Sequence, residues 1–306
     1  MNILITGASG FMGKALSKAL DDGKNKLVLL NSRSADLTKD VSLLKYNDLK
    51  YDLIFHLAAW TQAGDFCLYH QGEQWIINQQ INTNTLAWWQ QYQPQAKMIA
   101  FGTSVSYSTE DNLSESVYMS GMPNEKFYAY AMSKRMLYSG LISLNRQFGL
   151  NYLYLVPSTL YGPDYHTDGR QMHFIFDLIR KIIRGKEYGE KVALWGDGYQ
   201  RREIVYIDDF ISILLKLSAG TDNEILNIGA GEDYNIREFA SSICNIVGYD
   251  FSSIGFDTTK YVGAKSKFLN VQKLKSFLPD QKMSSLEHGL KKTIEWFYKD
   301  KVYDLE

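Results

Sequence analysis

The sequence predicts an α/β fold, a doubly wound parallel sheet with helices on both faces, and three observations lead to this prediction. Residues 3–13 read as a short apolar strand that runs into three evenly spaced glycines and the start of a helix. From residue 2 to about residue 160, apolar strands alternate with helical segments. The chain has 306 residues, 45% of them hydrophobic, which is enough to bury the large core of such a sheet.

Composition and charge exclude several classes of function. The formal net charge is −1 and lysine and arginine form no long run, so we expect neither a nucleic-acid nor a membrane partner. No apolar run reaches the roughly 18 residues of a membrane span. The first expected strand begins at the start of the sequence, with no basic region and no cleavage site before it. The two cysteines, Cys67 and Cys244, lie far apart in the sequence. We therefore expect a cytoplasmic protein with reduced thiols and no metal site.

The glycine turn, with Gly7, Gly10 and Gly13, is typical of a dinucleotide site. Gly7 allows a tight turn, Gly10 lets the backbone approach a phosphate, and Gly13 lets the helix pack on the strand. The N-terminus of the following helix then binds the pyrophosphate. The alternative is an ordinary turn between a strand and a helix. The complete context, three glycines at this spacing between the first strand of the chain and a helix, disfavours that alternative.

Residues 26–30 are expected to form a second buried strand, and the segment beyond it indicates which cofactor is used. An acidic residue there binds the ribose 2′-hydroxyl of NAD, whereas a basic one accepts the 2′-phosphate of NADP. The segment 31–34 holds Arg33 and no carboxylate. This favours NADPH over NADH, with a solvated surface arginine as the alternative for Arg33.

The next expected elements are a strand over 53–59, a helix over 76–91 and a strand over 97–102. The first of them ends in small residues, Ala58 and Ala59, that allow a cofactor to lie close. The helix carries Trp88 and Trp89, which we expect to pack against the sheet or against a partner subunit.

Tyr130 and Lys134 are the candidate catalytic pair. They are four residues apart on a predicted helix and therefore share a face, whereas Tyr128 has no lysine at that spacing. A nearby ammonium favours the phenolate, so we expect Lys134 to lower the pKa of Tyr130. Tyr130 then becomes a proton donor or acceptor, and Thr103 supplies a hydroxyl at the end of the preceding strand.

The glycine turn, Thr103, Tyr130 and Lys134 together resemble the extended short-chain dehydrogenase/reductase family of NAD(P)-dependent sugar-nucleotide epimerases, dehydratases and reductases. The resemblance implies a Rossmann-like sheet domain with a smaller C-terminal substrate-binding lobe. It also implies that Thr103 hydrogen-bonds the reacting oxygen, Tyr130 transfers the proton, and Lys134 holds the nicotinamide ribose. Further cofactor contacts implied in this way are Ser9, Phe11, Met12, Leu37, Leu57, Ala58, Ala59, Pro157 and Leu160.

The second half of the chain fits this resemblance. We expect the family's sixth strand within 152–163, a helix over 174–184 ended by Gly185, and a final sheet strand over 224–229. Ser284 and Glu287 are expected to form a capping box at the start of the last helix, which runs to about Tyr298. Residues 1–162 with 203–229 are assigned to the cofactor domain, and residues 163–202 and 230–306 to the nucleotide-sugar lobe.

Within the family the chain is similar to the GDP-L-fucose synthases, through the stretch 156–163, His173, Trp195 and the Arg202–Glu203 pair. The resemblance implies these substrate-binding residues: Thr103, Ser104, Val105, Thr159, His173, Lys181, Trp195, Arg202 and Lys267. His173 is expected to act as an acid or a hydrogen-bond donor, with an ordinary core or surface histidine as the alternative. Arg202 is expected to bind the pyrophosphate, and Arg201 is the second choice.

Two differences from the GDP-L-fucose synthases restrict the reactions that we expect of this chain. Val105 stands where the synthases have their epimerising cysteine, and Thr159 stands where they have an asparagine. Valine cannot remove a proton from carbon, so we expect NADPH-dependent reduction at C4 of a nucleotide-linked 4-keto-sugar for surface polysaccharides, and the resemblance implies GDP as the nucleotide. The pair Ser104–Val105 also replaces the two acids of the 4,6-dehydratases.

Two alternatives stay open, an epimerase acting at C4 or at C3 and C5, and a non-catalytic NADP-binding sensor. A homodimer is expected in each case.

Overall fold

The computed structural model describes residues 1–108, 113–260, 266 and 268–304. Its centre is a six-stranded sheet built from β1 (Asn2–Thr6), β2 (Lys26–Leu30), β3 (Leu53–His56), β4 (Lys97–Phe101), β5 (Tyr152–Pro157) and β10 (Glu224–Ile228). The strand order is β10–β5–β4–β3–β1–β2, and every neighbouring pair runs parallel. The predicted parallel sheet is confirmed.

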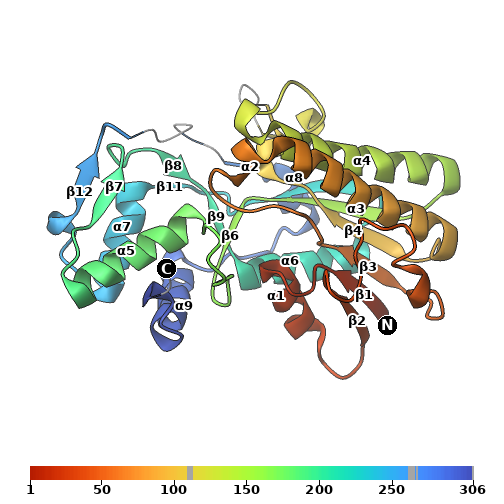
Figure 1. Cartoon of the computed structure of the whole chain (residues 1–306), viewed down its shortest axis with the longest axis horizontal. Helices are drawn as coiled ribbons and strands as arrows, with labels where there is room; N and C mark the ends of the chain where they lie inside the picture. Colours follow the sequence, from red (N-terminus) through yellow and green to blue (C-terminus); the bar gives the residue numbers. More distant parts are fainter. Residues whose placement is uncertain (109–112, 261–265, 267, 305–306) are drawn as a thin grey trace.

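Helices cover both faces of the sheet, as a doubly wound fold requires (Figure 1). In that view α3 (Gln71–Tyr92) and α4 (Tyr128–Phe148) lie above the strands, and α1 (Phe11–Leu20) and α6 (Ile207–Gly220) lie below them. The short helix α2 (Phe66–Tyr69) precedes α3, and α8 (Gln272–Phe277) packs beside β10. Among the helices of the described residues, none has the length and apolar character to cross a membrane.

The order of the strands reverses between β1 and β3, and the region outside the carboxyl ends of these two strands is the expected ligand crevice of such a sheet. The chain leaves β1 toward one edge to form β2, and then crosses back to build the other half from β3 onward. Ligands bind to such sheets outside the carboxyl ends of the strands, at the point where this order reverses. Gly7 follows β1 directly and Leu57 follows β3 directly, so both lie at this point.

The edge position of β2 corrects the expectation of a buried strand. Leu30 is buried, but Leu29 is 46% exposed and Lys26 is also exposed. An edge strand has a neighbouring strand on one side only, so its side chains are less covered. An apolar run of five residues does not distinguish an edge strand from a central one.

The two tryptophans of α3 pack inside the chain. Trp88 is 2% exposed and donates its indole N–H to Asn47 Oδ1 (2.7 Å), and Trp89 is fully buried and donates to the Ala96 carbonyl (2.9 Å). Of the two interpretations of this pair, packing against the chain's own sheet is therefore correct. Cys67 and Cys244 are both buried and are not bonded to each other.

A second group of short elements lies at the left of Figure 1. It comprises α5 (Phe174–Tyr188), α7 (Ile236–Val247), α9 (Leu286–Lys299), β7 (Ala193–Trp195), β8 (Arg201–Arg202), β11 (Tyr234–Asn235) and β12 (Gly255–Asp257). β12 pairs parallel with β7, β11 pairs antiparallel with β8, and α5 packs on α7. The exact division of the chain into two domains stays a prediction.

The helix α5 continues past Gly185, where the sequence predicted its end. It ends at Tyr188, and Gly189 closes it with a left-handed φ of 68°. A Cβ on Gly185 would lie 2.5 Å from Val192 Cγ2. Gly185 therefore permits close packing inside the lobe rather than ending the helix.

The predicted sixth strand is two strands. β5 belongs to the main sheet and is its fifth strand in chain order, whereas β6 (Thr159–Tyr161) pairs with β9 (Ile204–Tyr206) outside it. Between them, the Ser158 N–H donates to the Ile228 carbonyl at the end of β10 (2.9 Å). The chain thus passes from the sheet to the smaller lobe along β6.

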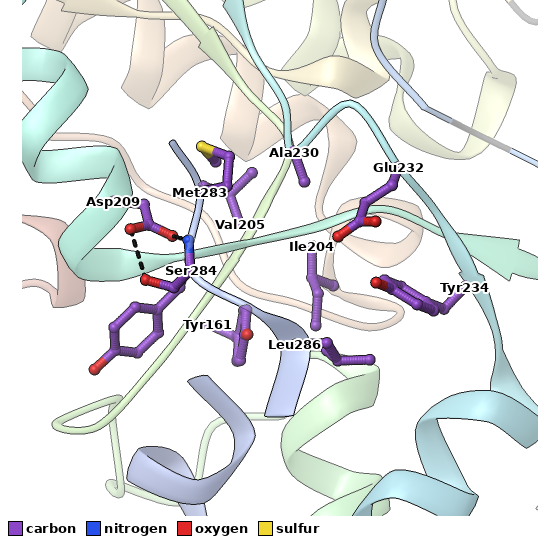
Figure 2. Close-up of a pocket in the computed structure, with 11 residues that line it drawn as sticks. Tyr161, Ile204, Val205, Asp209, Ala230, Glu232, Tyr234, Met283, Ser284 and Leu286 are labelled. Carbon is purple, nitrogen blue, oxygen red and sulfur yellow. Dashed lines mark hydrogen bonds between the residues drawn. The ribbon is translucent and has the colours of Figure 1, made fainter. Parts of the chain in front are cut away.

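The start of α9 corrects the predicted capping box by one residue. Ser285 is the N-cap, and its hydroxyl accepts the His288 N–H (3.2 Å). Ser284 instead donates its N–H (2.8 Å) and its hydroxyl (2.9 Å) to the Asp209 carboxylate, as Figure 2 shows. The last helix is thereby joined to the first turn of α6.

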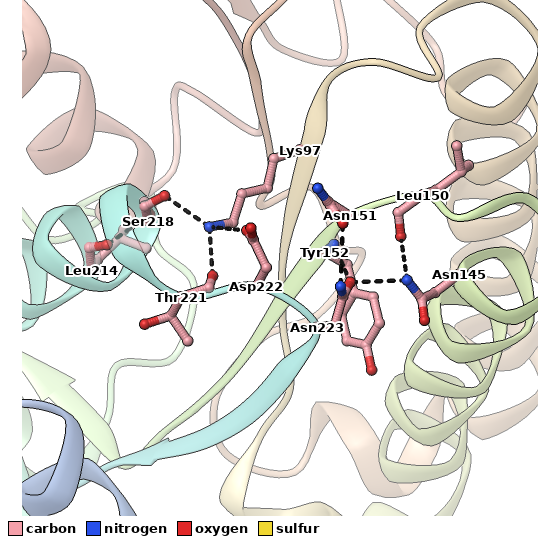
Figure 3. A network of polar contacts seen from close by, with 10 residues as sticks. All are labelled: Lys97, Asn145, Leu150, Asn151, Tyr152, Leu214, Ser218, Thr221, Asp222 and Asn223. Atoms are coloured by element: carbon pink, nitrogen blue, oxygen red, sulfur yellow. Dashed lines mark hydrogen bonds and ion pairs between the residues drawn. The ribbon is translucent and has the colours of Figure 1, made fainter.

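Lys97 joins the amino end of β4 to the junction of α6 and β10 (Figure 3). Its side chain is 12% exposed, and its ammonium donates to the Ser218 carbonyl (2.8 Å) and to the Thr221 carbonyl and pairs with Asp222 (2.8 Å). These contacts lie at the end of the sheet opposite the crevice. They hold β10 beside β5 and β4, so that the carboxyl ends of these strands are aligned.

Candidate active site

The turn between β1 and α1 is built by backbone contacts that only glycine allows. A Cβ on Gly7, whose φ is 69°, would lie 2.8 Å from the Ala58 nitrogen. A Cβ on Gly13 would lie 2.3 Å from the Gly7 carbonyl oxygen and 2.7 Å from Ala8 Cα. Without side chains at these positions, β1, α1 and the segment after β3 meet in van der Waals contact.

Gly10 faces outward from the same turn. It is exposed, it is the N-cap of α1, and no side chain of the described residues caps this helix. A Cβ on Gly10 would meet the Gly7 carbonyl oxygen at 3.3 Å, a tight but tolerable contact. The first N–H groups of α1, next to exposed Ser9 and partly buried Phe11 and Met12, can therefore hold an anion. The turn fits a dinucleotide pyrophosphate.

The carboxyl end of β2 forms a tight turn around Asn31. The Asn31 side-chain oxygen accepts the N–H groups of Arg33 (2.9 Å) and Ser34 (3.1 Å). Arg33 is exposed at this strand end, and Leu37 is buried beneath it with its carbonyl bound to Asn84 (3.0 Å). The basic side chain of Arg33 thus lies at the strand end where dinucleotide-binding proteins contact the ribose 2′ position of the cofactor.

His56, the last residue of β3, is a buried neutral histidine. Burial, assisted by Lys134, lowers its pKa to about 4. Its ring contacts Thr6 Oγ1 (3.0 Å) on one side and Asn82 Oδ1 (3.2 Å) on the other, and Thr6 Oγ1 also accepts the Ala58 N–H (3.2 Å). This network joins the ends of β1 and β3 to α3. It positions the segment 57–59, whose three residues are partly buried.

Thr103 follows β4 and stands beside the helix that carries Tyr130. Its Oγ1 accepts the Val105 N–H (3.4 Å) at the start of the 3-10 turn η2 (Ser104–Ser106). Ser106 donates its hydroxyl to the Ala131 carbonyl (3.2 Å) in α4. Thr103, Ser104 and Val105 are partly buried.

Tyr130 and Lys134 lie one turn apart in α4, as their spacing predicts. The Lys134 side chain points toward Tyr130, with its Nζ 5.8 Å from the centroid of the Tyr130 ring, and Lys134 is 5% exposed. The Tyr154 hydroxyl donates to the Lys134 carbonyl (2.7 Å), and Arg135 donates to the Ser106 carbonyl (2.9 Å). These bonds hold the start of α4 against the segment after β4.

The ionisation of this pair differs from the prediction. Burial raises the pKa of Tyr130 above its ordinary value and lowers the pKa of Lys134 to about 8. The expected lowering of the Tyr130 pKa by Lys134 is therefore wrong for this arrangement, because desolvation is the largest cause acting on each group. Cys67 and Tyr118 also raise the Tyr130 pKa, whereas the Thr61 hydroxyl opposes the rise.

His173 is the N-cap residue of α5 and is exposed, so it is not a core histidine. Desolvation of the ring by neighbouring protein atoms, together with His166, lowers the pKa of His173 to about 4. Two residues before it, Gln171 Oε1 accepts the Asp65 N–H (3.3 Å). A Cβ on Gly64 would overlap the Gln171 amide. The segment before His173 therefore lies against the segment after β3.

The other predicted residues near the end of β5 are Pro157, Thr159 and Leu160. Pro157 ends β5, and Thr159 and Leu160 belong to β6. All three are partly buried. They lie where the chain passes from the sheet to the smaller lobe.

The two neighbouring arginines of β8 have different surroundings. Arg201 is tied to Asp233 (2.9 Å) and lies 3.7 Å from Glu238. Arg202 is partly buried, its Nη1 donates to the Arg201 carbonyl (2.7 Å), and burial lowers its pKa. Arg201, the second choice for the diphosphate, is therefore already held by two carboxylates.

The remaining predicted substrate residues are spread over the smaller lobe. Lys181 pairs with Asp177 one turn earlier in α5 (2.7 Å), and Trp195 is 59% exposed on β7. Within the described residues, no contact joins either of them to Tyr130. Lys267 lies outside the described residues. The buried Glu203 carboxylate, next to Arg202 in the sequence, accepts the N–H groups of Gly231 (3.1 Å) and Leu269 (3.0 Å).

Sequence reasoning missed the polar residues of α3 that face this site. Gln74, Asn78 and Asn82 are 0%, 2% and 5% exposed, and all three bind the segments that surround Tyr130 and Lys134. Their spacing of four residues places them on one face of a helix. Three amide side chains at that spacing were the signal that could have revealed them.

A family model described as the NAD dependent epimerase/dehydratase family matches residues 3–229. The chain belongs to this family. The matched range covers the glycine turn, the segment of Thr103, and both Tyr130 and Lys134.

Individual relatives are similar to this chain in sequence or in fold over nearly its whole length. A GDP-L-colitose synthase from Yersinia pseudotuberculosis is 27% identical over 99% of this chain and 100% of its own length. A GDP-L-fucose synthetase from Naegleria fowleri bound to NADP superposes with a TM-score of 0.87 at 23% identity, covering 98% of this chain and 94% of that one. A GDP-6-OMe-4-keto-L-xylo-heptose reductase from C. jejuni superposes at 0.86 with 24% identity, covering 98% of both. At these identities the two structures establish the fold.

The glycine turn allows a paired test of fold and cofactor binding. Gly13→Ala should lower the free energy of unfolding by about 1–3 kcal/mol, because its Cβ meets backbone that cannot move aside. Gly10→Ala should leave that free energy nearly unchanged but weaken NADPH binding, because a methyl group at this exposed position would crowd the first N–H groups of α1. Denaturant unfolding and NADPH fluorescence titration measure the two effects. Equal stability of the two variants would contradict this interpretation.

The buried Lys134 ammonium should lower the free energy of unfolding near pH 7. Its pKa falls from 10.5 to about 8 in the folded chain, so below pH 8 the fold carries the full cost of a buried ammonium. Between pH 8 and 10.5 the unfolded chain binds more protons, and the stability rises with pH. Lys134→Met should therefore be more stable near pH 7, by at most about 3 kcal/mol, and this gain should vanish above pH 10.5. Denaturant unfolding across this pH range, with exposed Lys39→Met as control, measures the difference.

Proposed function

We propose that this protein is an NADPH-dependent reductase of the C4 carbonyl of a nucleotide-linked 4-keto-sugar, with GDP as the nucleotide. The observation that carries the proposal is the position of Tyr130 and Lys134, one turn apart on α4, a helix that packs against the turn η2 directly after Thr103. The whole-length similarity to a GDP-L-colitose synthase supports the choice of a GDP-sugar.

The chain's own residues supply the proton chemistry. The bound nicotinamide cofactor supplies the hydride to the carbonyl carbon. Thr103 and Tyr130 present hydroxyls to the carbonyl oxygen as negative charge develops on it, and such donors stabilise that charge. Tyr130 gives its proton to this oxygen, and Lys134 holds the nicotinamide ribose and stabilises the phenolate. Because burial raises the Tyr130 pKa, Tyr130 is held in the protonated form that a reduction needs.

The smaller lobe is proposed to hold the nucleotide sugar. Arg202 binds the diphosphate through its planar guanidinium, and Trp195 and Lys267 contribute to the nucleotide site. Thr159, His173 and Lys181 are assigned to the substrate from the same side, with Ser104 and Val105 on the side of the sheet. His173 is exposed at the N-terminus of α5, where it can hydrogen-bond a sugar hydroxyl.

Epimerisation is the second candidate function, and one observation favours it. His173, one member of the acid–base pair that C3/C5 epimerisation needs, is present and accessible. Val105 fills the position of the other member and has no proton to exchange. We therefore assign simple reduction to the chain. The expected homodimer and cytoplasmic location stay predictions.

Reduction of a GDP-4-keto-6-deoxy-hexose tests the proposed function. The enzyme should consume NADPH and form the C4 alcohol, because a hydride from the cofactor adds to the C4 carbon and Tyr130 protonates the C4 oxygen. Tyr130→Phe should lose about 10²–10⁴-fold in kcat while it binds NADPH normally, since general acid catalysis contributes that much. Absorbance of NADPH and NMR of the product measure both results.

The same reaction in deuterated water separates the candidate functions. Reduction without epimerisation leaves C3 and C5 unlabelled, whereas deuterium at either carbon at the rate of turnover would establish an epimerase. Tight NADP(H) binding without turnover of any 4-keto-sugar would favour a sensor instead.

Cofactor choice should depend on Arg33. The wild-type enzyme should prefer NADPH over NADH in kcat/KM, because the exposed guanidinium at the end of β2 can pair with the 2′-phosphate. Arg33→Ala should lose most of this preference through a higher KM for NADPH, with the KM for NADH unchanged. Lys39→Ala, at an exposed position nearby in sequence, is the control. Equal use of both cofactors by wild type and variant would remove Arg33 from the site.

A further inference from the structure

The start of α4, which carries Tyr130 and Lys134, is bonded to the sheet through a tyrosine of β5. The Tyr154 hydroxyl donates to the Lys134 carbonyl (2.7 Å). A carbonyl inside a helix uses one lone pair for its helical hydrogen bond, and the second lone pair can accept a bond of this kind. Tyr154 is fully buried, so water does not compete for this bond. The candidate catalytic lysine is therefore tied by its own backbone to a strand of the main sheet.

A second tyrosine fixes the place and the direction of the Tyr154 hydroxyl. Tyr118 Oη lies 3.1 Å from Tyr154 Oη, and Tyr118 is also fully buried. A carbonyl oxygen can only accept, so the Tyr154 proton goes to Lys134 and Tyr118 is the donor within the pair. Burial raises the pKa of Tyr154 well above its usual value, with a smaller contribution from Tyr118. Tyr154 therefore keeps its proton and remains a donor to Lys134.

The same pair of hydroxyls lies against the backbone directly before Thr103. A Cβ on Gly102 would lie 2.7 Å from Tyr118 Oη and 3.0 Å from Tyr154 Oη. The lack of a side chain at Gly102 thus allows both hydroxyls to approach the end of β4. One buried pair of hydroxyls therefore contacts both segments of the candidate site, the segment of Thr103 and the helix of Lys134.

Other bonds between α4 and the segment after β4 are made by the neighbours of Lys134 in the helix. Ser106 donates its hydroxyl to the Ala131 carbonyl (3.2 Å), and Arg135 donates to the Ser106 carbonyl (2.9 Å). These bonds hold the helix as a whole. The Tyr154 bond differs from them because its acceptor is the backbone of the residue whose side chain points toward Tyr130.

We propose that Tyr154 is a positioning residue for the reduction, because its bond to the Lys134 carbonyl sets where the Lys134 ammonium lies. The proposal rests on the proposed function, in which Lys134 holds the nicotinamide ribose and stabilises the Tyr130 phenolate. In that step the Tyr130 O–H bond breaks, an O–H bond forms on the C4 oxygen, and the cofactor supplies the hydride to C4. Tyr154 keeps its proton throughout. A displacement of about 1 Å in a group that acts on the reacting atoms can cost up to about a hundredfold in rate.

Tyr154→Phe removes only the hydroxyl, and Tyr138→Phe is its matched control. Tyr138 lies in α4 and its ring stacks on that of Tyr154 (4.8 Å between centroids), so the control removes a hydroxyl from the same ring cluster and keeps the bond to Lys134. One buried hydrogen bond contributes about a factor of five to an equilibrium. Tyr154→Phe should therefore lower kcat with the GDP-4-keto-6-deoxy-hexose about fivefold and raise the Kd for NADPH by a similar factor, with the KM for the sugar unchanged.

Tyr138→Phe should keep the wild-type kcat, Kd and KM. Circular dichroism at the assay temperature shows that each variant is folded, so that the three constants refer to the native enzyme. An equal loss of kcat in Tyr138→Phe and Tyr154→Phe would overturn the proposal, because it would indicate a general loosening of the ring cluster.

A double-mutant cycle with Lys134→Met shows whether Tyr154 acts through Lys134. In the Lys134→Met background, Tyr154→Phe should have no further effect on kcat, because the side chain that it positions is gone. A further fivefold loss there would reject the proposal. A wild-type kcat in Tyr154→Phe with a large loss in Lys134→Met would overturn the role of Tyr154 alone. A wild-type kcat in Lys134→Met would instead overturn the proposed function of Lys134, and the role of Tyr154 with it.

Discussion

Three backbone segments meet at the Gly7–Gly13 turn, and their contact determines where the cofactor turn and the segment after β3 lie. The end of β1, the start of α1 and the segment after β3 approach until no Cβ can be placed at Gly7 or Gly13. With this contact in place, the N-terminus of α1 lies at the carboxyl ends of β1 and β3 and its first N–H groups have no side-chain cap among the described residues. It also sets the position of Ala58, and hence of the segment that reaches Thr61. The cofactor cradle and one wall of the catalytic site therefore depend on the same few atoms.

The second organising feature is the buried amide face of α3. Gln74, Asn78 and Asn82 occupy positions where apolar residues are common in a helix packed on a sheet, and they bind Thr61, the Trp60 backbone and His56. Buried polar groups of this kind are stable only when they are paired, and pairing allows few geometries. α3 thus holds its neighbours in defined positions, which packing of aliphatic side chains alone does less well.

Much of the fold could be predicted because its signals are local. The apolar runs of β1, β3, β4 and β10 end at turn residues, and the spacing of Tyr130 and Lys134 follows from the helix alone. The errors concern quantities that depend on distant neighbours. The exposure of Leu29 depends on β2 being at the edge, and the packing role of Gly185 depends on Val192. The pKa of Tyr130 depends on burial by residues from other elements, such as Cys67 and Tyr118.

A column of aromatic rings joins the sheet to the smaller lobe at one end of the crevice. Phe11, at the start of α1, meets Tyr165 edge-on (5.0 Å between centroids), Tyr165 stacks on Phe176 (4.1 Å), and Phe176 stacks on Phe297 of α9 (6.5 Å). Edge-on and stacked rings of this kind add to the stability that their buried area provides. The start of the helix that borders the cofactor turn and two helices of the smaller lobe therefore share one aromatic cluster.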